Sequence, residues 1–450
     1  MGLHLVILAA GKGTRMRSDL PKVLHQVAHA PLLIHAMKAG EALDPLSTII
    51  VAGHGAEAVE TAAKAHTPDV QVVLQNEQLG TAHAVDQARA QLKDAEGDVV
   101  VLYGDTPFIQ PETIARMQEA RARHDIVVLG FDAADPGKYG RLVMQGERLE
   151  RIVEFKDANE SERAISFCNS GVILAPAKVM FELIAEVGND NASGEYYLTD
   201  LPALAQARGL SATAVACDES ETLGVNSRAD LAAAEEAFQT RQRATLLEIG
   251  VTLSAPQTVH LAHDTLIGPD TIIEQHVVFG PGVTVENGAH IRAFSHLEGC
   301  HVSRGAIVGP YARLRPGAEI AEHARIGNFV EIKNAEIAEA AKVNHLTYIG
   351  DARVGTRSNI GAGTVTCNYD GVMKHHTEIG ADTFIGSNTM LVAPVRVGDR
   401  AMTATSSTIT TDVPDEALAI GRAKQTNKAG LAVKLFEMLR AKKAGQVKGE

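Results

Sequence analysis

A glycine-rich segment, LAAGKGTR at residues 8–15, directly follows an apolar run with the pattern of a β-strand. Glycines let the backbone approach an anion closely and turn its N–H groups toward it, while Lys12 and Arg15 add positive charge. Lys22 in LPKVLH comes seven residues after Arg15 and can reach the same anion. The spacing matches neither the Walker A loop nor the G-x-G-x-x-G fingerprint. We therefore predict a phosphate-binding loop, with an ordinary strand-to-helix turn as the alternative.

A carboxylate closes another apolar run, DVVVLYGD, in which Asp105 is the last residue. At the end of a strand, a carboxylate can hold Mg²⁺ against a triphosphate. Ligands of an α/β sheet collect at the carboxyl ends of its strands. Asp105 is therefore a candidate metal ligand, and an aspartate that merely caps a turn is the alternative.

A third group of chemically capable residues lies in KVNHLTYIGD, residues 342–351. A neutral imidazole at His345 can take a proton from an amine that attacks a carbonyl. Arg315 and Lys333 are eighteen residues apart and can form a phosphate clamp if the chain returns to the same side after eighteen residues. Tyr348 and Asn359 supply polar groups nearby. A histidine that only decorates the surface is the alternative for His345.

Two different periods must position these groups. Up to residue 226, short β-branched runs alternate with helical ones, which predicts α/β units around a mostly parallel sheet. Residues 227–249 have a helical pattern and read as a linker helix. Beyond them the period becomes six, the period of hexapeptide β-helices, in which short strands form a three-sided prism of roughly eight to ten coils. The buried slot is predicted to hold Val302, Val308, Leu314, Ile320, Ile326, Ile332, Ile337, Val343, Ile349, Ile379, Ile385, Leu391 and Val397.

The period fails at TVTCNYDGVMKHH, a loop that contains Asn368 and Tyr369. Loops that break a regular scaffold often carry function, although a harmless insertion is the alternative. The β-helix is expected to cover residues 250–421. The tail, residues 422–450, turns basic with Lys442, Lys443 and Lys448, and we expect a solvated, partly disordered end.

The composition limits the function classes. The 450 residues carry a formal net charge of −13, which argues against a dedicated nucleic-acid partner. The apolar start has no basic leader, and no run approaches the ~20 apolar residues of a membrane span. The cysteines show neither zinc-type pairs nor a disulfide framework, which favours a cytoplasmic location; they are Cys168, Cys217, Cys300 and Cys367.

LAAGKGTRM, LPKVL and LYGDTPFI resemble the sugar-phosphate nucleotidyltransferases. The resemblance implies that a sugar 1-phosphate oxygen attacks the α-phosphorus of a nucleoside triphosphate and expels pyrophosphate, a reaction that needs positioning and charge neutralisation. It implies Asn226 of GVNSR as a second Mg²⁺ ligand beside Asp105. In the similar uridyltransferases, QNEQLGTAHA surrounds the uracil, and GEYYLTD lies near the sugar unless Tyr196 and Tyr197 only pack against the sheet. The residues implied to bind UTP and UDP-N-acetylglucosamine are Leu8, Ala9, Ala10, Gly11, Lys22, Gln75, Gly80, Thr81, Tyr103, Gly104, Asp105, Gly140, Glu154, Asn169 and Asn226.

NIGAGT and EIGADTFIGSNT resemble the hexapeptide acyltransferases, whose parallel β-helix is left-handed and which are usually trimers with active sites between neighbouring rods. NFVEIKNA, NHLTYIGD and GAGTVTCNYDG are similar to the bacterial N-acetylglucosamine-1-phosphate uridyltransferase/glucosamine-1-phosphate N-acetyltransferase family, over nearly the whole chain. This resemblance implies that His345 is the base and that glucosamine 1-phosphate binds Arg315, Lys333, Tyr348 and Asn359. Acetyl-CoA would contact Ala362, Asn368, Tyr369, Ser387, Thr405 and Arg422. Thr405 and Ser406 stand where that family commonly has Ala-Gly, which affects the fit of the pantetheine arm.

We thus expect an α/β Rossmann-like domain followed by a left-handed parallel β-helix in a homotrimeric, Mg²⁺-dependent enzyme with two sites. One would acetylate glucosamine 1-phosphate with acetyl-CoA, and the other would couple the product to UTP, giving UDP-N-acetylglucosamine for cell-wall and lipopolysaccharide synthesis. The first alternative keeps only nucleotidyl transfer and makes the β-helix a trimerising or regulatory module. The second, a purely structural solenoid, explains neither LAAGKGTR nor the broken period.

Overall fold

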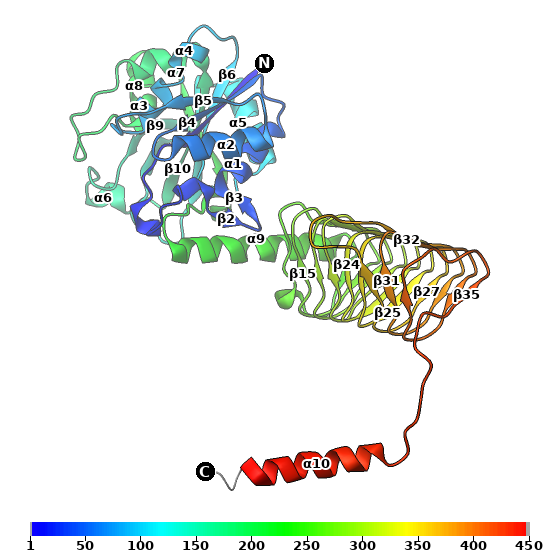
Figure 1. Cartoon of the computed structure of the whole chain (residues 1–450). Coiled ribbons are helices and arrows are strands. Elements are labelled where there is room, and N and C mark those ends of the chain that lie inside the picture. Colours follow the sequence, from blue (N-terminus) through cyan, green and yellow to red (C-terminus); the bar gives the residue numbers. More distant parts are fainter. Residues whose placement is uncertain (1, 447–450) are drawn as a thin grey trace. The chain divides into compact units, whose positions relative to one another are not determined.

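The computed structural model describes residues 2–446, which form two compact units (Figure 1). The first unit contains the chain up to Thr245 together with His260–Thr265. The second contains Leu246–Val259 and the described chain from Leu266 onward. Within residues 2–446, no helix combines the length and the apolar character needed to cross a lipid bilayer.

The first unit is built on a nine-stranded sheet with the order β5-β4-β1-β6-β10-β7-β11-β9-β8. β1 pairs in parallel with β4 and β6, whereas β10 runs antiparallel to β6 and β7. The sheet is therefore mixed, which corrects the expectation of a mostly parallel one. The nine strands are β1 (Leu3–Ala9), β4 (Ser47–Ala52), β5 (Gln71–Leu74), β6 (Asp98–Tyr103), β7 (Ile126–Asp132), β8 (Arg141–Gln145), β9 (Arg148–Val153), β10 (Phe167–Pro176) and β11 (Ala212–Cys217).

Helices cover both faces of this sheet, because the central strands are apolar on both sides. Val6 and Leu8 of β1 belong to a core with α3, α7 and α8, and Leu5 and Ile7 belong to a core with α1, α2 and α5. The helices are α1 (Leu32–Glu41), α2 (Ala56–His66), α3 (Thr81–Asp86), α4 (Arg89–Leu92), α5 (Pro111–Arg121), α6 (Glu160–Arg163), α7 (Ala177–Ile184) and α8 (Leu201–Ala207), and a short hairpin joins β2 (Gln26–Val27) to β3 (Ala30–Pro31).

The predicted linker helix exists as α9 (Arg228–Glu248), but most of it belongs to the first unit. Its Phe238 packs in an apolar cluster with Val27, Leu32 and Phe108. The Gln239 side chain, 1% exposed, donates to the Leu261 carbonyl at 2.7 Å and accepts from the Leu261 N–H at 2.9 Å. The structure therefore corrects the predicted domain boundary at residue 226, because burial of this apolar face and of the Gln239 amide ties α9 and residues 260–265 to the α/β unit.

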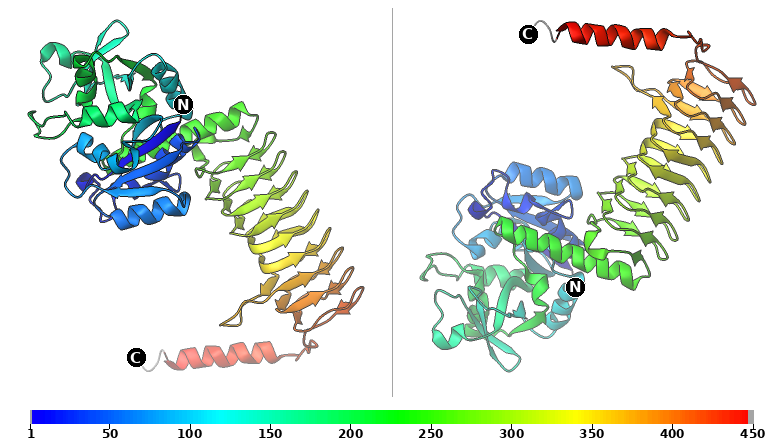
Figure 2. Two further views of the ribbon diagram at one scale, coloured as in Figure 1. Left: turned by 90° about the horizontal axis from the view of Figure 1, so that it is seen from above. Right: turned by 90° about the horizontal axis from the view of Figure 1, so that it is seen from below.

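The second unit contains a parallel β-helix, a rod of short strands that Figure 2 shows from two sides. One sheet stacks ten strands, which confirms the expected eight to ten coils. It consists of β12 (Thr252–Leu253), β14 (Ile272–Ile273), β17 (His290–Ile291), β20 (Ile307–Val308), β23 (Arg325–Asn328), β25 (Lys342–His345), β27 (Asn359–Ile360), β30 (Phe384–Ile385), β33 (Met402–Thr403) and β35 (Leu418–Ala419).

Two further columns complete the three sides of the rod, and β24 (Glu331–Ile337) and β26 (Tyr348–Val354) bend across both of them. One column contains β15 (Val278–Phe279), β18 (His296–Leu297), β21 (Arg313–Leu314), β28 (Val365–Cys367), β31 (Met390–Val392) and β34 (Thr408–Ile409). The other contains β13 (Leu266–Ile267), β16 (Thr284–Val285), β19 (Cys300–Val302), β22 (Ala318–Ile320), β29 (Thr377–Ile379) and β32 (Val395–Val397). All thirteen aliphatic residues of the six-residue period are buried inside, as predicted.

We name the first of these two columns, which carries Tyr348, the clamp face. The edge where a coil enters it from the ten-stranded sheet is the histidine edge, because His345 lies there. The edge where a coil leaves it, at Asn334 and Asp351, is the amide edge. Along the histidine edge an aromatic ladder of His276, Phe294, Tyr311 and Phe329 stacks with ring centroids 4.9, 4.9 and 5.3 Å apart.

The tail differs from its prediction. Residues 431–446 form helix α10 (Leu431–Gln446) instead of a disordered end, and its side chains through Gly445 are exposed. The prediction of disorder considered only the lysines and the basic charge of the tail. It did not take account of the apolar residues that recur along this segment, such as Leu435, Phe436 and Leu439. Lys448 lies outside the described residues.

Candidate active sites

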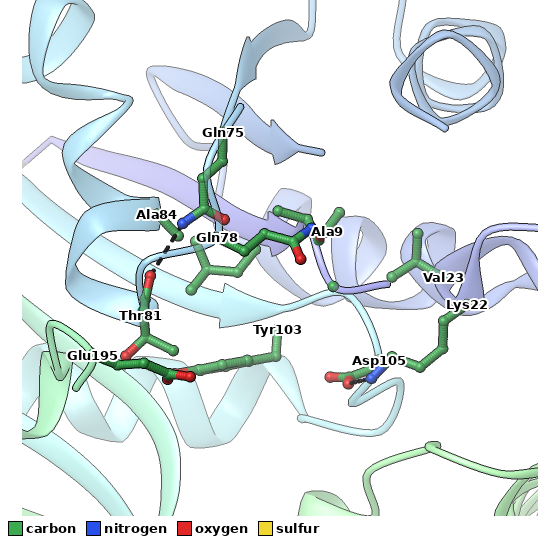
Figure 3. Close-up of a pocket in the computed structure, with 14 residues that line it drawn as sticks. Ala9, Lys22, Val23, Gln75, Gln78, Thr81, Ala84, Tyr103, Asp105 and Glu195 are labelled. Carbon is green, nitrogen blue, oxygen red and sulfur yellow. Dashed lines mark hydrogen bonds and ion pairs between the residues drawn. The ribbon is translucent and has the colours of Figure 1, made fainter. Parts of the chain in front are cut away.

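The carboxyl ends of β1 and β6 meet because the two strands pair in parallel, and a pocket of about 240 Å³ opens there (Figure 3). Ten of the predicted nucleotide-binding residues line it, together with Val23, Gln78, Ala84 and Glu195; the ten are Leu8, Ala9, Ala10, Gly11, Lys22, Gln75, Gly80, Thr81, Tyr103 and Asp105. Gly104 does not line this pocket, but its N–H donates to the Leu8 carbonyl at 3.0 Å and so fixes the loop between Tyr103 and Asp105.

Two side-chain oxygen atoms face the ammonium group of Lys22, one of the residues that line this pocket. The Lys22 ammonium contacts the Asp105 carboxylate and lies 3.0 Å from Asn226 Oδ1. Asn226 reaches this position because the neighbouring Val225 N–H donates to the Asp105 carbonyl at 2.9 Å. A carboxylate and an amide oxygen that face the same positive charge are suitable Mg²⁺ ligands, since Mg²⁺ takes one or two protein oxygens and fills its shell with phosphate and water. The residues present therefore fit the expected metal.

The inner end of the pocket is shaped by a tightly fixed loop. Gln75 is buried, and its Nε2 donates to the Gly80 carbonyl at 3.1 Å. Gly80 has φ of +120°, and a Cβ built on it would lie 2.5 Å from the Tyr196 carbonyl oxygen. Backbone bonds join Tyr196 to Leu79 at 2.8 Å and to Ala82 at 2.9 Å. The side chain of Tyr196 packs on the hydrophobic core, which agrees with the alternative that Tyr196 only packs against the sheet.

A second pocket of about 370 Å³ shares Thr81, Tyr103 and Glu195 with the first, so the two adjoin. Of the residues predicted for the sugar, Glu154 and Asn169 line it. Gly140 does not, but its carbonyl accepts from the Asn169 N–H at 2.9 Å. Burial raises the pKa of Glu154, and the nearby Asp157, Asp200 and Glu195 add to the rise, whereas a hydrogen bond from Thr199 opposes it.

His345 lies on the histidine edge with an exposed side chain. Its Nδ1 is 3.0 Å from Asn328 Oδ1, which sits one coil earlier in direct register. Because an amide oxygen can only accept, this bond places the proton of a neutral imidazole on Nδ1 and leaves Nε2 as the proton acceptor. The arrangement suits a general base.

The same edge carries most of the residues predicted for acetyl-CoA. The Gly363 N–H donates to the His345 carbonyl at 3.3 Å, which places neighbouring Ala362 one coil above the histidine. Ala362 accepts from Asn388 at 2.7 Å, Ser387 accepts from Ser406 at 2.8 Å, and Arg422 donates to the Thr405 carbonyl at 2.8 Å. Ala362, Ser387, Thr405 and Arg422 thus form one column. Ser406 has φ of +60°, a conformation that glycine adopts without strain.

Across the clamp face, near the amide edge, the structure assembles a cationic group. Arg315 and Lys333 occupy adjacent coils in register, as their spacing predicted, and Arg315 also pairs with Glu331 at 2.8 Å. A Cβ built on Gly350, the register partner of Lys333, would lie 2.3 Å from the Tyr348 hydroxyl, so this hydroxyl lies close to Lys333. Asn368 and Tyr369 follow β28 on the same edge.

One rod does not unite all the predicted residues. Arg315, Lys333, Tyr348, Asn368 and Tyr369 gather toward the amide edge, and His345 with the acetyl-CoA column follows the opposite edge. Asn359 lies on the ten-stranded sheet, in register with Lys342. About three strand residues, roughly 10 Å, separate the two edges of the clamp face.

The comparisons with known proteins cover the whole chain. A family model described as a MobA-like NTP transferase domain matches residues 5–184. Proteins named "Bifunctional protein GlmU" from Ruegeria sp. (strain TM1040) and Ruegeria pomeroyi are each 72% identical and cover 100% of both chains. A third, from Jannaschia sp. (strain CCS1), is 63% identical over 99% of this chain and 98% of its own. The chain belongs to the family of bifunctional GlmU proteins.

Several side chains at the two sites of this GlmU family member escaped sequence reasoning. Lys138, Lys156 and Thr199 line the second pocket and were not predicted as site residues, although Lys138 and Lys156 each stand two residues from a predicted one and Thr199 belongs to GEYYLTD. Lys374 lies beside Lys333, and this contact lowers the pKa of Lys374. Its signal was available, since Lys374 is the basic residue of the loop TVTCNYDGVMKHH that breaks the period.

Proposed function

We propose that each unit carries one active site and that the two sites act in sequence on one sugar. The β-helix acetylates glucosamine 1-phosphate with acetyl-CoA, and the first unit transfers the uridylyl group of UTP to the N-acetylated product. As a member of the family of bifunctional GlmU proteins, the chain is an enzyme with both activities. The observation that carries the assignment of sites is the separation of two constellations, one around Lys22 and Asp105 and one around His345.

For uridylyl transfer, Lys22 and the N–H groups of the glycine-rich loop bind the triphosphate. The enzyme uses Mg²⁺, which Asp105 and Asn226 would hold and which supplies neutralisation of phosphate charge. Glu154 and Asn169 orient the sugar so that its phosphate oxygen faces the α-phosphorus. The nucleotide and sugar pockets adjoin, so the two substrates can react directly, and catalysis through positioning and charge needs no covalent intermediate.

For acetyl transfer, Nε2 of His345 takes a proton from the sugar amine as the amine attacks the thioester carbonyl. Asn328 holds the Nδ1–H and so maintains the tautomer in which Nε2 is free. A positioned base of this kind contributes typically 10²- to 10⁴-fold to the rate. Collapse of the tetrahedral intermediate forms the acetamide and expels the thiolate of coenzyme A. Arg315 and Lys333 bind the sugar phosphate.

The division of these residues over two edges supports a homotrimer formed through the β-helix. A neighbouring copy that sets its amide edge against the histidine edge would bring a phosphate clamp to His345. The aromatic ladder supports the histidine edge as the contact surface, since Phe294, Tyr311 and Phe329 are 45%, 48% and 55% exposed in the single chain. Contiguous exposed apolar side chains of this kind typify protein contacts.

We assign the enzyme to the cytoplasm, where UTP and acetyl-CoA are both present. The four cysteines, all within the described residues, are free thiols, in keeping with a reducing compartment. UDP-N-acetylglucosamine formed there feeds cell-wall synthesis.

Two single variants separate the sites. His345→Ala should abolish thiol release from acetyl-CoA with glucosamine 1-phosphate and leave pyrophosphate release from UTP with N-acetylglucosamine 1-phosphate unchanged. Asp105→Asn should do the reverse, because it removes the anionic metal ligand. Absence of thiol release by the wild-type protein, in a sample that releases pyrophosphate, would favour an enzyme confined to nucleotidyl transfer. Equal loss of both reactions in either variant would contradict two independent sites.

A further inference from the structure

Three polar side chains form a ladder along the amide edge, each one coil after the last. Asn334 Nδ2 donates to Asp351 Oδ1 at 2.6 Å, and Asn368 Nδ2 donates to Asp351 Oδ2 at 2.5 Å, both across seventeen residues. We propose that Asp351 is a positioning residue for acetyl transfer, which anchors the loop 368–376 and so holds Lys374 beside Lys333. The proposal rests on the acetyltransferase site described above and adds a residue to it.

The backbone places Asp351 for this role. Asn334 and Asp351 have φ of +44° and +46°, the left-handed conformation that lets the chain turn the corner between two sides of the rod. Asparagine and aspartate are the residues other than glycine that adopt it most readily. Two asparagines would satisfy the same turns, so the backbone alone does not require a carboxylate at the centre of the ladder. A carboxylate is needed there because both neighbours present an N–H donor to it.

The loop that follows Asn368 is held together by its own hydrogen bonds. The His375 N–H returns to the Asn368 carbonyl at 2.8 Å, and Tyr369 and Lys374 form an antiparallel bridge. Asp370 accepts from the N–H groups of Val372 and Met373 at the tip. These bonds hold residues 368–376 together as one unit. The Asn368 side chain, in a residue only 7% exposed, is fixed to the rod by Asp351, which sets the direction in which the loop projects.

Charge makes this anchor specific to the sugar phosphate. Lys374 stands beside Lys333, and this contact between like charges is unfavourable by itself. Asp351 offsets it, because its carboxylate interacts with both ammonium groups. Although burial opposes ionisation, the hydrogen bonds from Asn334 and Asn368 and the two lysines lower the pKa of Asp351, so the carboxylate is charged at neutral pH. Asp351 thus keeps two lysines close enough for one phosphate to bind both.

Asp351→Asn tests the proposal without a change of backbone preference, because asparagine also adopts the left-handed conformation. The variant offers one acceptor oxygen to two N–H donors and no charge. A hydrogen bond to a charged group contributes about 1.5–3 kcal/mol, so the KM for glucosamine 1-phosphate should rise about ten- to hundredfold. The pH profile of kcat should stay that of the wild type, because His345 is untouched. Pyrophosphate release from UTP should also be unchanged.

Asp382→Asn is the matched control. Asp382 also has a positive φ, +53°, and its carboxylate pairs with Arg357 at 2.7 Å at the third edge of the rod, between β29 and β30, which does not border the clamp face. Both reactions should be unaffected by it. The exchange Asp351→Asn with Asn368→Asp keeps one carboxylate in the ladder and gives each remaining amide N–H an acceptor oxygen, residue 351 for Asn334 and residue 368 for residue 351, so it should recover most of the lost affinity for glucosamine 1-phosphate.

A KM for glucosamine 1-phosphate within twofold of the wild-type value in Asp351→Asn would overturn the positioning role. A fall in kcat with no change in that KM would overturn it as well, since it would indicate a general loss of structure in the rod. Absence of thiol release by the wild-type enzyme would instead refute the acetyltransferase assignment itself, so the two failures are distinguishable.

Discussion

At the residue scale, the nucleotide pocket depends on one glycine whose conformation and surroundings both exclude a side chain. Gly80 combines φ of +120° with a backbone neighbour, Tyr196, that leaves no space for a Cβ. Sequence reasoning selected Gly80 by resemblance, and the structure supplies the physical reason. Lys22 and Asp105 were instead predicted from their own motifs, a glycine-rich loop and the end of an apolar strand. Lys138 and Lys156 were missed although each stands two residues from a predicted site residue, because the sequence does not show which side chains of these segments face the pocket.

We predict that Gly80→Ala raises the KM for UTP at least tenfold and leaves acetyl transfer unchanged. The added Cβ must displace the Tyr196 backbone, which lies between Glu195 and Tyr197 of the sugar pocket. The conformation of Gly80, with φ of +120° and ψ of 178°, is essentially restricted to glycine and costs another residue about 1–3 kcal/mol. Pyrophosphate release at varied UTP measures the effect. Gly146→Ala is the control, since Gly146 has φ of +61° but no atom within 4 Å of the added Cβ. Equal effects of the two variants would show that backbone strain alone is responsible.

At the element scale, the six-residue period located the rod because each short strand contributes one buried aliphatic residue. The period does not encode where a corner must bend into the left-handed conformation or how an insertion folds, so the amide edge and the loop 368–376 emerged only from the structure. In the first unit, strands were predictable from β-branched runs. The antiparallel insertion of β10 between β6 and β7 was not, because strand order depends on long-range packing rather than on local pattern.

Helix α1 buries a histidine that makes the first unit sensitive to acid. His35 lies 2.9 Å from the Val27 carbonyl and packs edge-on against Phe238 and His263. Burial lowers its pKa to about 4, and the nearby charges of His263, Lys38 and Arg241 act in the same direction, while the hydrogen bond to Val27 opposes them. The folded state therefore keeps His35 neutral at pH values where the unfolded chain binds a proton.

The sign of the effect follows from proton binding. Between about pH 6.5 and pH 4 the unfolded state binds more protons, so the free energy of unfolding falls as the pH falls, by up to about 3 kcal/mol from this residue. We predict that His35→Gln, which can still donate to Val27, reduces this dependence. Urea unfolding followed by circular dichroism at 222 nm at pH 7 and pH 5 measures it. An identical loss of stability in both proteins would assign the acid sensitivity to other groups.

At the scale of the whole molecule, the acetyltransferase site should exist only in the assembled oligomer. The aromatic ladder lies on the same edge as His345, so a contact that covers the ladder also encloses the base. The rings are stacked along one edge of the rod, so a second rod that lies alongside this edge would bury the apolar area of all of them at once. This burial favours side-by-side association of rods.

Tyr311→Glu introduces a charge at the centre of the ladder, and we predict that it shifts the protein from trimer to monomer. Thiol release should be lost with the trimer, whereas pyrophosphate release should persist. Light scattering and the two activity assays together provide the measurement. Leu266→Glu is the control, because Leu266 is 64% exposed on another side of the rod. A trimeric Tyr311→Glu protein with no acetyltransferase activity would move the subunit contact elsewhere.

The two hydrogen bonds between the Gln239 side chain and the Leu261 backbone limit how this polypeptide could be divided or rearranged by evolution or by design. These bonds cross from the long helix to a segment twenty-two residues later, so the catalytic α/β body continues past the start of the repeat. A gene cut at codon 226 would encode an α/β domain that lacks helix α9, so the side chains of Val27, Leu32 and Phe108 would be exposed to solvent. Cutting after codon 265 would keep Gln239 with Leu261 but would separate β12 from β14, its partner in the ten-stranded sheet, so an exchange of repeat arrays must carry residues 246–265 together with both the helix and the rod.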